Sequence, residues 1–155
     1  MSEHIDDGAE ELEELGPIDW IVIGWPGKRP DGSELAPKII ELVDRGIIRV
    51  LDIAFAAKAD DGTISALDLD HLGPDSPFAV FAGASSGLID HADVEEAAAA
   101  LDPGDSAAIL LYENRWAAPL AVALRRSGGL LLADGRIEIQ AIIAALDALE
   151  AVDAA

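Results

Sequence analysis

The sequence contains no cysteine and few aromatic residues. Without cysteine the chain can form no disulfide, no thiolate metal site and no cysteine nucleophile. Of its 155 residues only three are Trp, one is Tyr and three are Phe, although 51% are apolar. We therefore expect a core of Leu, Ile, Val and Ala side chains with few large anchors.

Positive charge is also scarce. Ten Lys and Arg stand against thirty Asp and Glu, which gives a net charge of −20. A field of this sign repels phosphate groups and anionic lipid, so neither nucleic acid nor a membrane surface is expected as a partner. The longest weakly polar run, residues 78–89, is about half the roughly 20 residues of a membrane-spanning helix. Residues 1–15 lack the features of a signal peptide or presequence, so we expect a cytoplasmic protein.

Length and charge divide the chain into three segments. Residues 1–15 carry seven carboxylates and no Lys or Arg, which indicates a disordered, solvated tail or, alternatively, a docking tail for a basic partner. Residues 16–150 are long enough for a single α+β domain with one core. Residues 151–155 are then a short C-terminal tail.

The second half of the sequence has the pattern of a β-α-β unit. An apolar strand at residues 107–112 is followed by a polar turn and a helix at about 116–126. A glycine pair ends this helix, and a second apolar strand follows at 130–133. The strand at 107–112 is apolar on both faces, which is typical of a central strand.

An earlier segment repeats this pattern. A strand at residues 18–25, also apolar on both faces, precedes a helix and another strand. When the numbering is shifted by 82 positions, Pro37 coincides with Pro119 and Gly46 with Gly128. The prolines fall in the first turn of each helix, where a missing N–H costs least. The sequence therefore predicts an internal repeat.

Two such halves, residues 18–57 and 107–133, predict a ferredoxin-like split β-α-β plait. This fold is an antiparallel sheet with two helices on one face, and the strands at 18–25 and 107–112 should be central. The additions to it are a hairpin strand at residues 63–69, an inserted helix at about 91–101 and a terminal helix at about 138–150. Residues 78–81 form either a brief strand or a segment that covers the core. Because both sheet faces are apolar, we predict a homo-oligomer, with a dimer as the expected form.

Glu113, Asn114, Arg115 and Trp116 are the first candidates for a ligand-binding site. They place an acid, an amide, a guanidinium and an indole at the end of a strand, a combination that suits a polar ligand. A structural interpretation is equally open: Asn114 caps the helix, Trp116 packs, and Glu113 pairs with Arg115 or Arg136.

Lys28 and Arg29 are the second candidate, as an anion-binding loop, because they are scarce positive charges in a negative field. In the predicted plait this loop and residues 113–116 lie at opposite ends of the sheet. The two polar loops should therefore not combine into one site.

No catalytic residue is predicted. Residues 83–87 match the G-x-S-x-G pattern of a nucleophile elbow, but the only later histidine, His91, lies six residues on, at the expected start of a helix. His71 and His91 both have carboxylates nearby in sequence, a pattern that suits a divalent metal. In a chain with thirty acidic residues it indicates surface charge and helix capping first, so neither a metal nor a cofactor is predicted.

Three turn and strand-start motifs carry a resemblance to a known group of proteins. They are residues 16–19 (Gly-Pro-Ile-Asp), residues 101–108 (Leu-Asp-Pro-Gly-Asp-Ser-Ala-Ala) and residues 133–137 (Ala-Asp-Gly-Arg-Ile). With these motifs the chain resembles an uncharacterised actinobacterial family of small acidic proteins, distantly similar to bacterial stress-related domains with a ferredoxin-like plait. The resemblance implies no catalytic residues. The distant relatives often carry a longer Gly- and Ala-rich apolar segment in the middle, and the corresponding residues 76–89 are fewer and more polar here, which argues against membrane association.

The leading functional hypothesis is a non-enzymatic, self-associating protein with a stress-related role. An acidic plait with two apolar sheet faces and no coherent catalytic set motivates it. The alternative is a small-molecule-binding or enzymatic plait that uses a pocket near residues 113–116.

Overall fold

The computed structural model describes residues 14–154 of the chain. Except for residues 14 and 15, the predicted acidic tail lies outside the described residues. The strands are β1 (Ile18–Trp25), β2 (Ile48–Lys58), β3 (Ile64–Leu67) and β4 (Ser106–Asn114). The helices are α2 (Leu35–Asp44), α3 (Leu69–Leu72), α4 (His91–Ala99), α5 (Ala118–Arg126) and α6 (Ile139–Ala154), with two 3-10 helices, η1 (Pro77–Phe81) and η2 (Arg115–Ala117).

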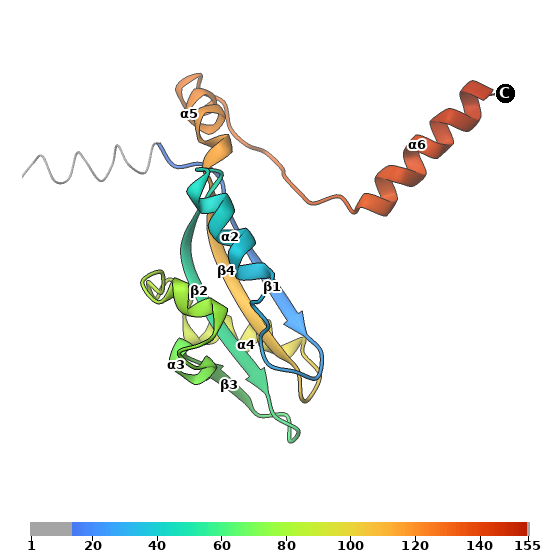
Figure 1. The fold of residues 1–155 in the computed structure, drawn as a ribbon. Coiled ribbons are helices and arrows are strands. Elements are labelled where there is room, and N and C mark those ends of the chain that lie inside the picture. Colours follow the sequence, from blue (N-terminus) through green and yellow to red (C-terminus); the bar gives the residue numbers. More distant parts are fainter. Residues whose placement is uncertain (1–13, 155) are drawn as a thin grey trace, which may run out of the picture.

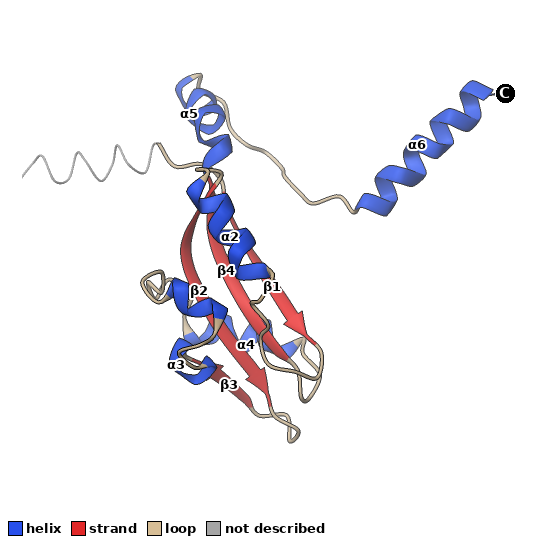
Figure 2. Ribbon diagram, viewed as in Figure 1, coloured by secondary structure: helices blue, strands red, loops and turns tan. Residues whose placement is uncertain are grey.

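The four strands form one open antiparallel sheet in the order β1-β4-β2-β3 (Figure 2). The fold is therefore α+β, as predicted. β4 pairs with β1 on one side and with β2 on the other, which makes it a central strand. β1 is an edge strand, so the prediction that residues 18–25 are central is wrong. The neighbour expected for it, residues 130–133, does not form a strand.

β1, α2 and β2 form a split β-α-β unit, because β4 lies between the two parallel-running strands. A Schellman turn follows the last residue of α2, and Gly46 takes the left-handed position of this turn with a φ of 70°. In this turn the N–H of Ile47 donates to the carbonyl of Leu42 over 2.9 Å. The N-cap residue of the helix is Glu34, whose side chain makes no capping hydrogen bond, and the hydroxyl of the preceding Ser33 donates to Asp31 Oδ1.

α2 and η1 cover one face of the sheet and enclose the main core (Figure 1). Phe78, on η1, is completely buried. Its ring lies 4.9 Å from that of Phe55 and 6.1 Å from that of Trp25, centroid to centroid. Residues 78–81 are therefore the covering segment of the two predicted alternatives, and they are not a strand. The other buried members of this core are Ala36, Ile39, Ile48, Ile53, Phe81, Ala108 and Leu110.

α4 packs on the opposite face of the sheet, where Val94 and Ala98 are buried beside Ile109. Asp90 Oδ1 accepts the N–H of Asp93 over 2.8 Å, and Asp93 Oδ2 accepts the N–H of Asp90 over 3.1 Å, which forms a capping box. The inserted helix thus covers part of the second face of the sheet.

α5 lies at the end of the sheet where β4 ends, and none of its residues is buried (Figure 1). The guanidinium of Arg125 donates to the carbonyl of Leu15 over 2.7 Å and holds the helix there. The predicted arrangement with both repeat helices on one face is therefore wrong. α5 nevertheless ends as α2 does: Gly128 has a φ of 81°, and the N–H of Gly129 donates to the carbonyl of Leu124 over 3.0 Å.

The chain after Gly129 leaves the body of the protein (Figure 1, orange to red). Residues 130–138 are neither helix nor strand, so the predicted strand at 130–133 is wrong, while α6 runs past its predicted end at 150. A strand needs a partner for its backbone hydrogen bonds, whereas a helix satisfies its own, which is why only the helix forms here. All residues from 130 to 154 are exposed, and we call them the C-terminal arm. Within the described residues, no helix has the length and apolarity needed to cross a bilayer.

Candidate functional site

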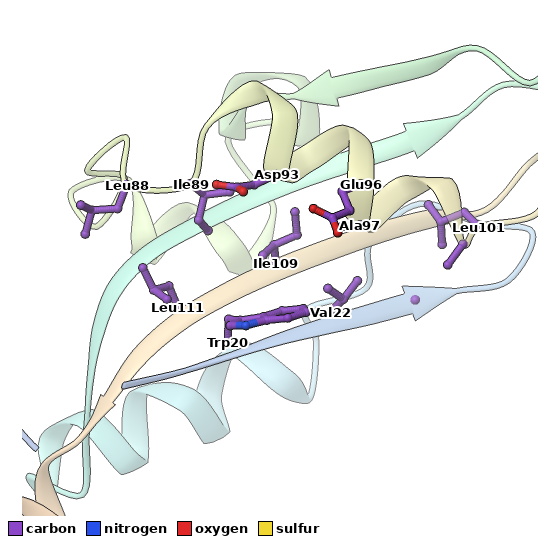
Figure 3. A pocket seen from close by; sticks show the side chains of 12 residues that line it. Trp20, Val22, Leu88, Ile89, Asp93, Glu96, Ala97, Leu101, Ile109 and Leu111 are labelled. Atoms are coloured by element: carbon purple, nitrogen blue, oxygen red, sulfur yellow. The ribbon is translucent and has the colours of Figure 1, made fainter. Parts of the chain in front are cut away.

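An apolar groove lies on the face of the sheet that α4 covers only in part. Its cavity volume is about 650 Å³, and strands β1 and β4 form its floor while α4 and the segment before it form one wall (Figure 3). The apolar lining includes Trp20, Val22, Leu88, Leu101, Ile109 and Leu111. Grooves of this size and character are the usual places where proteins bind a ligand or a partner.

The floor of the groove follows from strand alternation and from register. Trp20 is the partner of Leu111 across the β1–β4 ladder, and Val22 is the partner of Ile109. Since every second side chain of a strand points to the same face, these four lie side by side (Figure 3). The indole of Trp20 is uncovered, with 68% of the residue exposed.

The wall of the groove closes at one end and is acidic along its rim. A Cβ atom added at Gly24 would lie 3.7 Å from Leu101 Cδ2, so Leu101 sits directly over the glycine. Asp93 and Glu96 of α4 supply the charged groups of the lining. The lining contains no Ser, His, Lys or Arg, and most of its side chains are apolar.

The outer edge of β1 borders this groove. Pro17 accepts the N–H of Asn114 over 2.7 Å, so the hydrogen-bonded pairs of the β1–β4 ladder fall on the odd-numbered residues of β1. The backbone groups of the alternate residues Ile18, Trp20, Val22 and Gly24 therefore point away from β4. None of the described residues forms a strand beside them.

Glu113, the first of the predicted ligand-binding residues, is buried and 3% exposed. Its Oε2 accepts the N–H of Gly16 over 2.8 Å, and its Oε1 lies 3.0 Å from Nε of Arg49 on the neighbouring strand. The structural interpretation that pairs it with Arg115 or Arg136 is therefore wrong. Glu113 fastens the chain that enters β1 to the β2–β4 ladder.

Asn114 and Trp116 make local contacts at the same strand end. The amide of Asn114 donates to the carbonyl of Pro17 over 3.1 Å and to Asp19 Oδ2 over 2.9 Å, and it does not cap the following helix. The indole N–H of Trp116 donates to Asn114 Oδ1 over 3.3 Å. Trp116 is 66% exposed and Arg115 is also exposed, so a ligand site at residues 113–116 stays a prediction.

Lys28 and Arg29 both have partners within the protein. Lys28 Nζ lies 3.3 Å from Asp31 Oδ2, and the guanidinium of Arg29 donates to the carbonyl of His71 over 3.1 Å. Anion binding by this loop stays a prediction. The hydroxyl of Ser106, at the start of β4, donates to the carbonyl of Lys28, so the loop lies at the opposite end of the sheet from residues 113–116, as expected.

The family of the chain follows from comparison with family models. A model described as a family of unknown function, DUF6325, matches residues 14–153. The chain belongs to the DUF6325 family. No curated protein and no solved structure shows significant similarity to it.

In this DUF6325 chain the G-x-S-x-G loop has a structural partner that sequence reasoning missed. Asp52 is 2% exposed and lies at an irregularity of the β2–β4 ladder. Its carboxylate accepts the N–H of Ser86 over 3.0 Å and the N–H of Ile89 over 2.7 Å. The hydroxyl of Ser86 donates to the carbonyl of Leu51 over 2.7 Å. An acid inside an otherwise apolar strand is the signal that could have revealed this role.

Ser85, the serine at the centre of that pattern, lines a second cavity of about 460 Å³ together with His91. The imidazole of His91 pairs with Glu95, with 3.1 Å between Nε2 and Oε1. The imidazole of His71 also has a partner nearby in the sequence, because its Nδ1 accepts the N–H of Asp68 over 2.9 Å. Among residues 14–154 no three His, Asp or Glu side chains are grouped as a metal site would need.

The groove is what sequence reasoning did not locate in this DUF6325 chain. The two apolar faces of residues 18–25 and 107–112 signalled that β1 and β4 need cover on both sides. They did not signal that α4 would cover β2 and β4 and leave β1 bare. That depends on where the inserted helix packs, which strand patterns do not encode.

Proposed function

We propose that the protein is a non-enzymatic, self-associating cytoplasmic protein with a stress-related role. The observation that carries the proposal is the exposed apolar stripe of α6. This stripe has the i, i+3, i+4, i+7 spacing of a helix that packs on something. Its members are Ile139, Ile142, Ile143, Leu146 and Leu149, each between 46% and 77% exposed.

A helix of this kind is a strong candidate for an interface. Full burial of one Ile or Leu side chain contributes about 1.5–3 kcal/mol, and α6 holds five in one row. The groove beside β1 presents a second uncovered apolar surface in the same molecule. Contiguous apolar surfaces on both an arm and a body are typical of proteins that associate with their own kind.

The absence of a coherent catalytic set in the groove supports a non-enzymatic role. Its charged groups are Asp93 and Glu96, and Asp93 is already engaged in the cap of α4. A negative lining in a molecule with a net charge of −20 disfavours anionic substrates.

Light scattering after size-exclusion chromatography tests the self-association. The wild-type chain should elute with at least twice its monomer mass at micromolar concentration. The variant I142E/L146E should elute as a monomer, because two carboxylates would interrupt the stripe. The matched control A141E/A148E places the same charges on the opposite side of α6 and should stay associated. A wild-type monomer, or equal behaviour of the two variants, would refute the proposal.

The stress-related and cytoplasmic parts of the proposal rest on the resemblance to stress-related domains and on the acidic composition. Fractionation of cells should recover the protein in the cytoplasmic fraction. A deletion strain should survive heat, acid or oxidative stress less well than its parent, and the I142E/L146E variant should fail to restore survival. Unchanged survival under all three stresses would reject this part alone.

A further inference from the structure

We infer that the C-terminal arm of one copy completes the sheet of a second copy. Residues 130–133 pair as a fifth strand with the outer edge of β1 of that copy, and α6 then lies in its groove. The inference rests on the proposed self-association and names the surfaces that perform it.

The first argument is the local equivalence of α2 and α5. Both helices end in the same turn at positions 82 apart: Ile47 donates to Leu42, and Gly129 donates to Leu124. α2 leads straight into β2, which pairs with β4. In the second β-α pair, β4 and α5 correspond to β1 and α2 of the first. A strand that follows α5 should therefore pair with β1, just as β2 pairs with β4. The outer edge of β1 is open to such a strand.

The second argument is the state of the β1 edge. The backbone N–H and C=O groups that point away from β4 lie on every second residue of β1, as hydrogen bonding to a further strand requires. These residues are Ile18, Trp20, Val22 and Gly24. Residues 130–133, Leu-Leu-Leu-Ala, are apolar, exposed and in neither helix nor strand. An open edge and a strand-like segment without a partner are complementary, because each satisfies the backbone groups of the other.

The third argument is the fit between α6 and the groove. The eight residues of β1 span about 26 Å and the sixteen residues of α6 span about 24 Å at their standard rises. A strand beside β1 would leave the chain at the border of the groove, with only residues 134–138 before α6 begins. The five apolar side chains of α6 would then meet Trp20 and Val22, which are exposed, and Leu111, which is half-buried.

The position of α5 indicates a second copy as the acceptor. A strand that follows α5 as β2 follows α2 runs antiparallel to β1, as β2 does to β4, so it has to start nearer Trp25 and end nearer Ile18. α5 is held at the Ile18 end through the bond between Arg125 and Leu15, and the arm leaves directly after it, away from its own sheet (Figure 1). The arm can therefore reach the β1 edge of another molecule without dislodging α5. Reciprocal exchange gives a closed, twofold dimer.

Single-cysteine variants test the exchange, and because the native chain has no cysteine every crosslink is unambiguous. I23C is mixed with a series carrying one cysteine at each position from 130 to 133, the two partners bearing tags of different mass. Ile23 is chosen because it would form a close, non-hydrogen-bonded pair across the new ladder. Oxidation should give a mixed covalent dimer that is strongest at alternate positions of the series. The control S65C, on the opposite sheet edge at β3, should give none.

Hydrogen exchange of the wild-type chain gives a readout that needs no substitution in β1. The amides of Trp20 and Val22 should be protected in the associated protein and should lose that protection in I142E/L146E. Association through α6 alone, with these amides unprotected, would overturn the inference while leaving self-association intact. A crosslink within one chain in a double-cysteine variant would overturn it in favour of closure on its own sheet. A wild-type monomer would instead reject the proposed function.

Discussion

Arg49 and Glu113 are directly opposite each other in the β2–β4 ladder, with Nε and Oε1 3.0 Å apart. The carboxylate is almost completely buried, and the guanidinium is about half exposed. Because Glu113 also accepts the N–H of Gly16, it joins three parts of the chain at one end of the sheet.

Replacement of Glu113 by Ala should lower the free energy of unfolding. The change leaves the N–H of Gly16 without its acceptor and Arg49 without its partner, at a cost of about 1–3 kcal/mol. Urea denaturation measures it. The control E41Q removes an exposed carboxylate near Lys38 and Arg45 and should change stability by less than about 0.5 kcal/mol. Equal effects of the two variants would contradict a structural role for Glu113.

Replacement of Asp52 by Asn should loosen the loop before α4. The amide would turn an N–H₂ group toward backbone donors, which removes at least one of the bonds to Ser86 and Ile89 and costs about 1–3 kcal/mol. Hydrogen exchange at Ser86 and Ile89 should accelerate. The variant S86A removes only the hydroxyl bond to Leu51 and should leave the exchange of Ile89 unchanged. Unaltered exchange in D52N would show that the carboxylate does not hold this loop.

Replacement of Gly16 by Ala should be destabilising because of a close backbone approach. An added Cβ would overlap the carbonyl oxygen of Asn114 and crowd the N of Ala118, and a forced shift of this kind costs about 1–3 kcal/mol. The matched control is G83A, where nothing lies within 4 Å of the added atom. Thermal unfolding should separate the two variants clearly. A G16A midpoint as high as that of G83A would refute the tight packing.

The pKa of Asp31 is lower than its ordinary value, mainly because the hydroxyl and then the N–H of Ser33 donate to its carboxylate, with Lys28 contributing less. The stabilisation from these bonds is complete above the unfolded-state pKa and is lost as the pH falls through the lowered one. S33A should therefore raise the pKa of Asp31, measured from carboxyl carbon shifts in an NMR titration. The pKa of Asp61, lowered in the same way by Thr63, is the internal control and should not move. An unchanged Asp31 pKa would show that the hydroxyl does not cause the shift.

Added salt should strengthen the association of the chain with itself. The net charge of −20 makes any two copies repel each other, and salt shortens the screening length from about 10 Å at 0.1 M to about 3 Å at 1 M. Sedimentation at several NaCl concentrations should show a falling dissociation constant. Sucrose at equal osmolarity controls for excluded-solvent effects. Weaker association at high salt would mean that charge pairs, rather than apolar surface, hold the copies together.

The sequence predicted those elements whose signals are local. The two-sided apolarity of residues 107–112 identified β4 as central, the inserted helix expected from about residue 91 is present as α4, and Gly46, the counterpart of Gly128, marked the end of α2. The α+β class also followed from the strand and helix patterns, whereas the same two-sided apolarity wrongly placed β1 in the centre of the sheet.

What the sequence could not predict depends on partners that lie far away in the chain. Residues 130–133 are as apolar as a strand should be, but a strand exists only where an open edge receives it. Glu113 resembled a ligand group because its partner Arg49 is distant in sequence and adjacent only across the ladder. The groove arises from the packing position of α4, which its own periodicity does not specify.

The open edge of β1 also bears on how this protein behaves in solution. Edge strands are usually protected by lysines, prolines or bulges, whereas β1 carries one charged side chain, Asp19, in eight residues. In any copy whose β1 edge is not covered by the arm of a second copy, mutual repulsion of whole molecules is the main barrier to stacking of one edge on another. That barrier is smallest near the isoelectric point of about 4.1, so acidification to that pH should make the protein precipitate as β-rich aggregates before it unfolds.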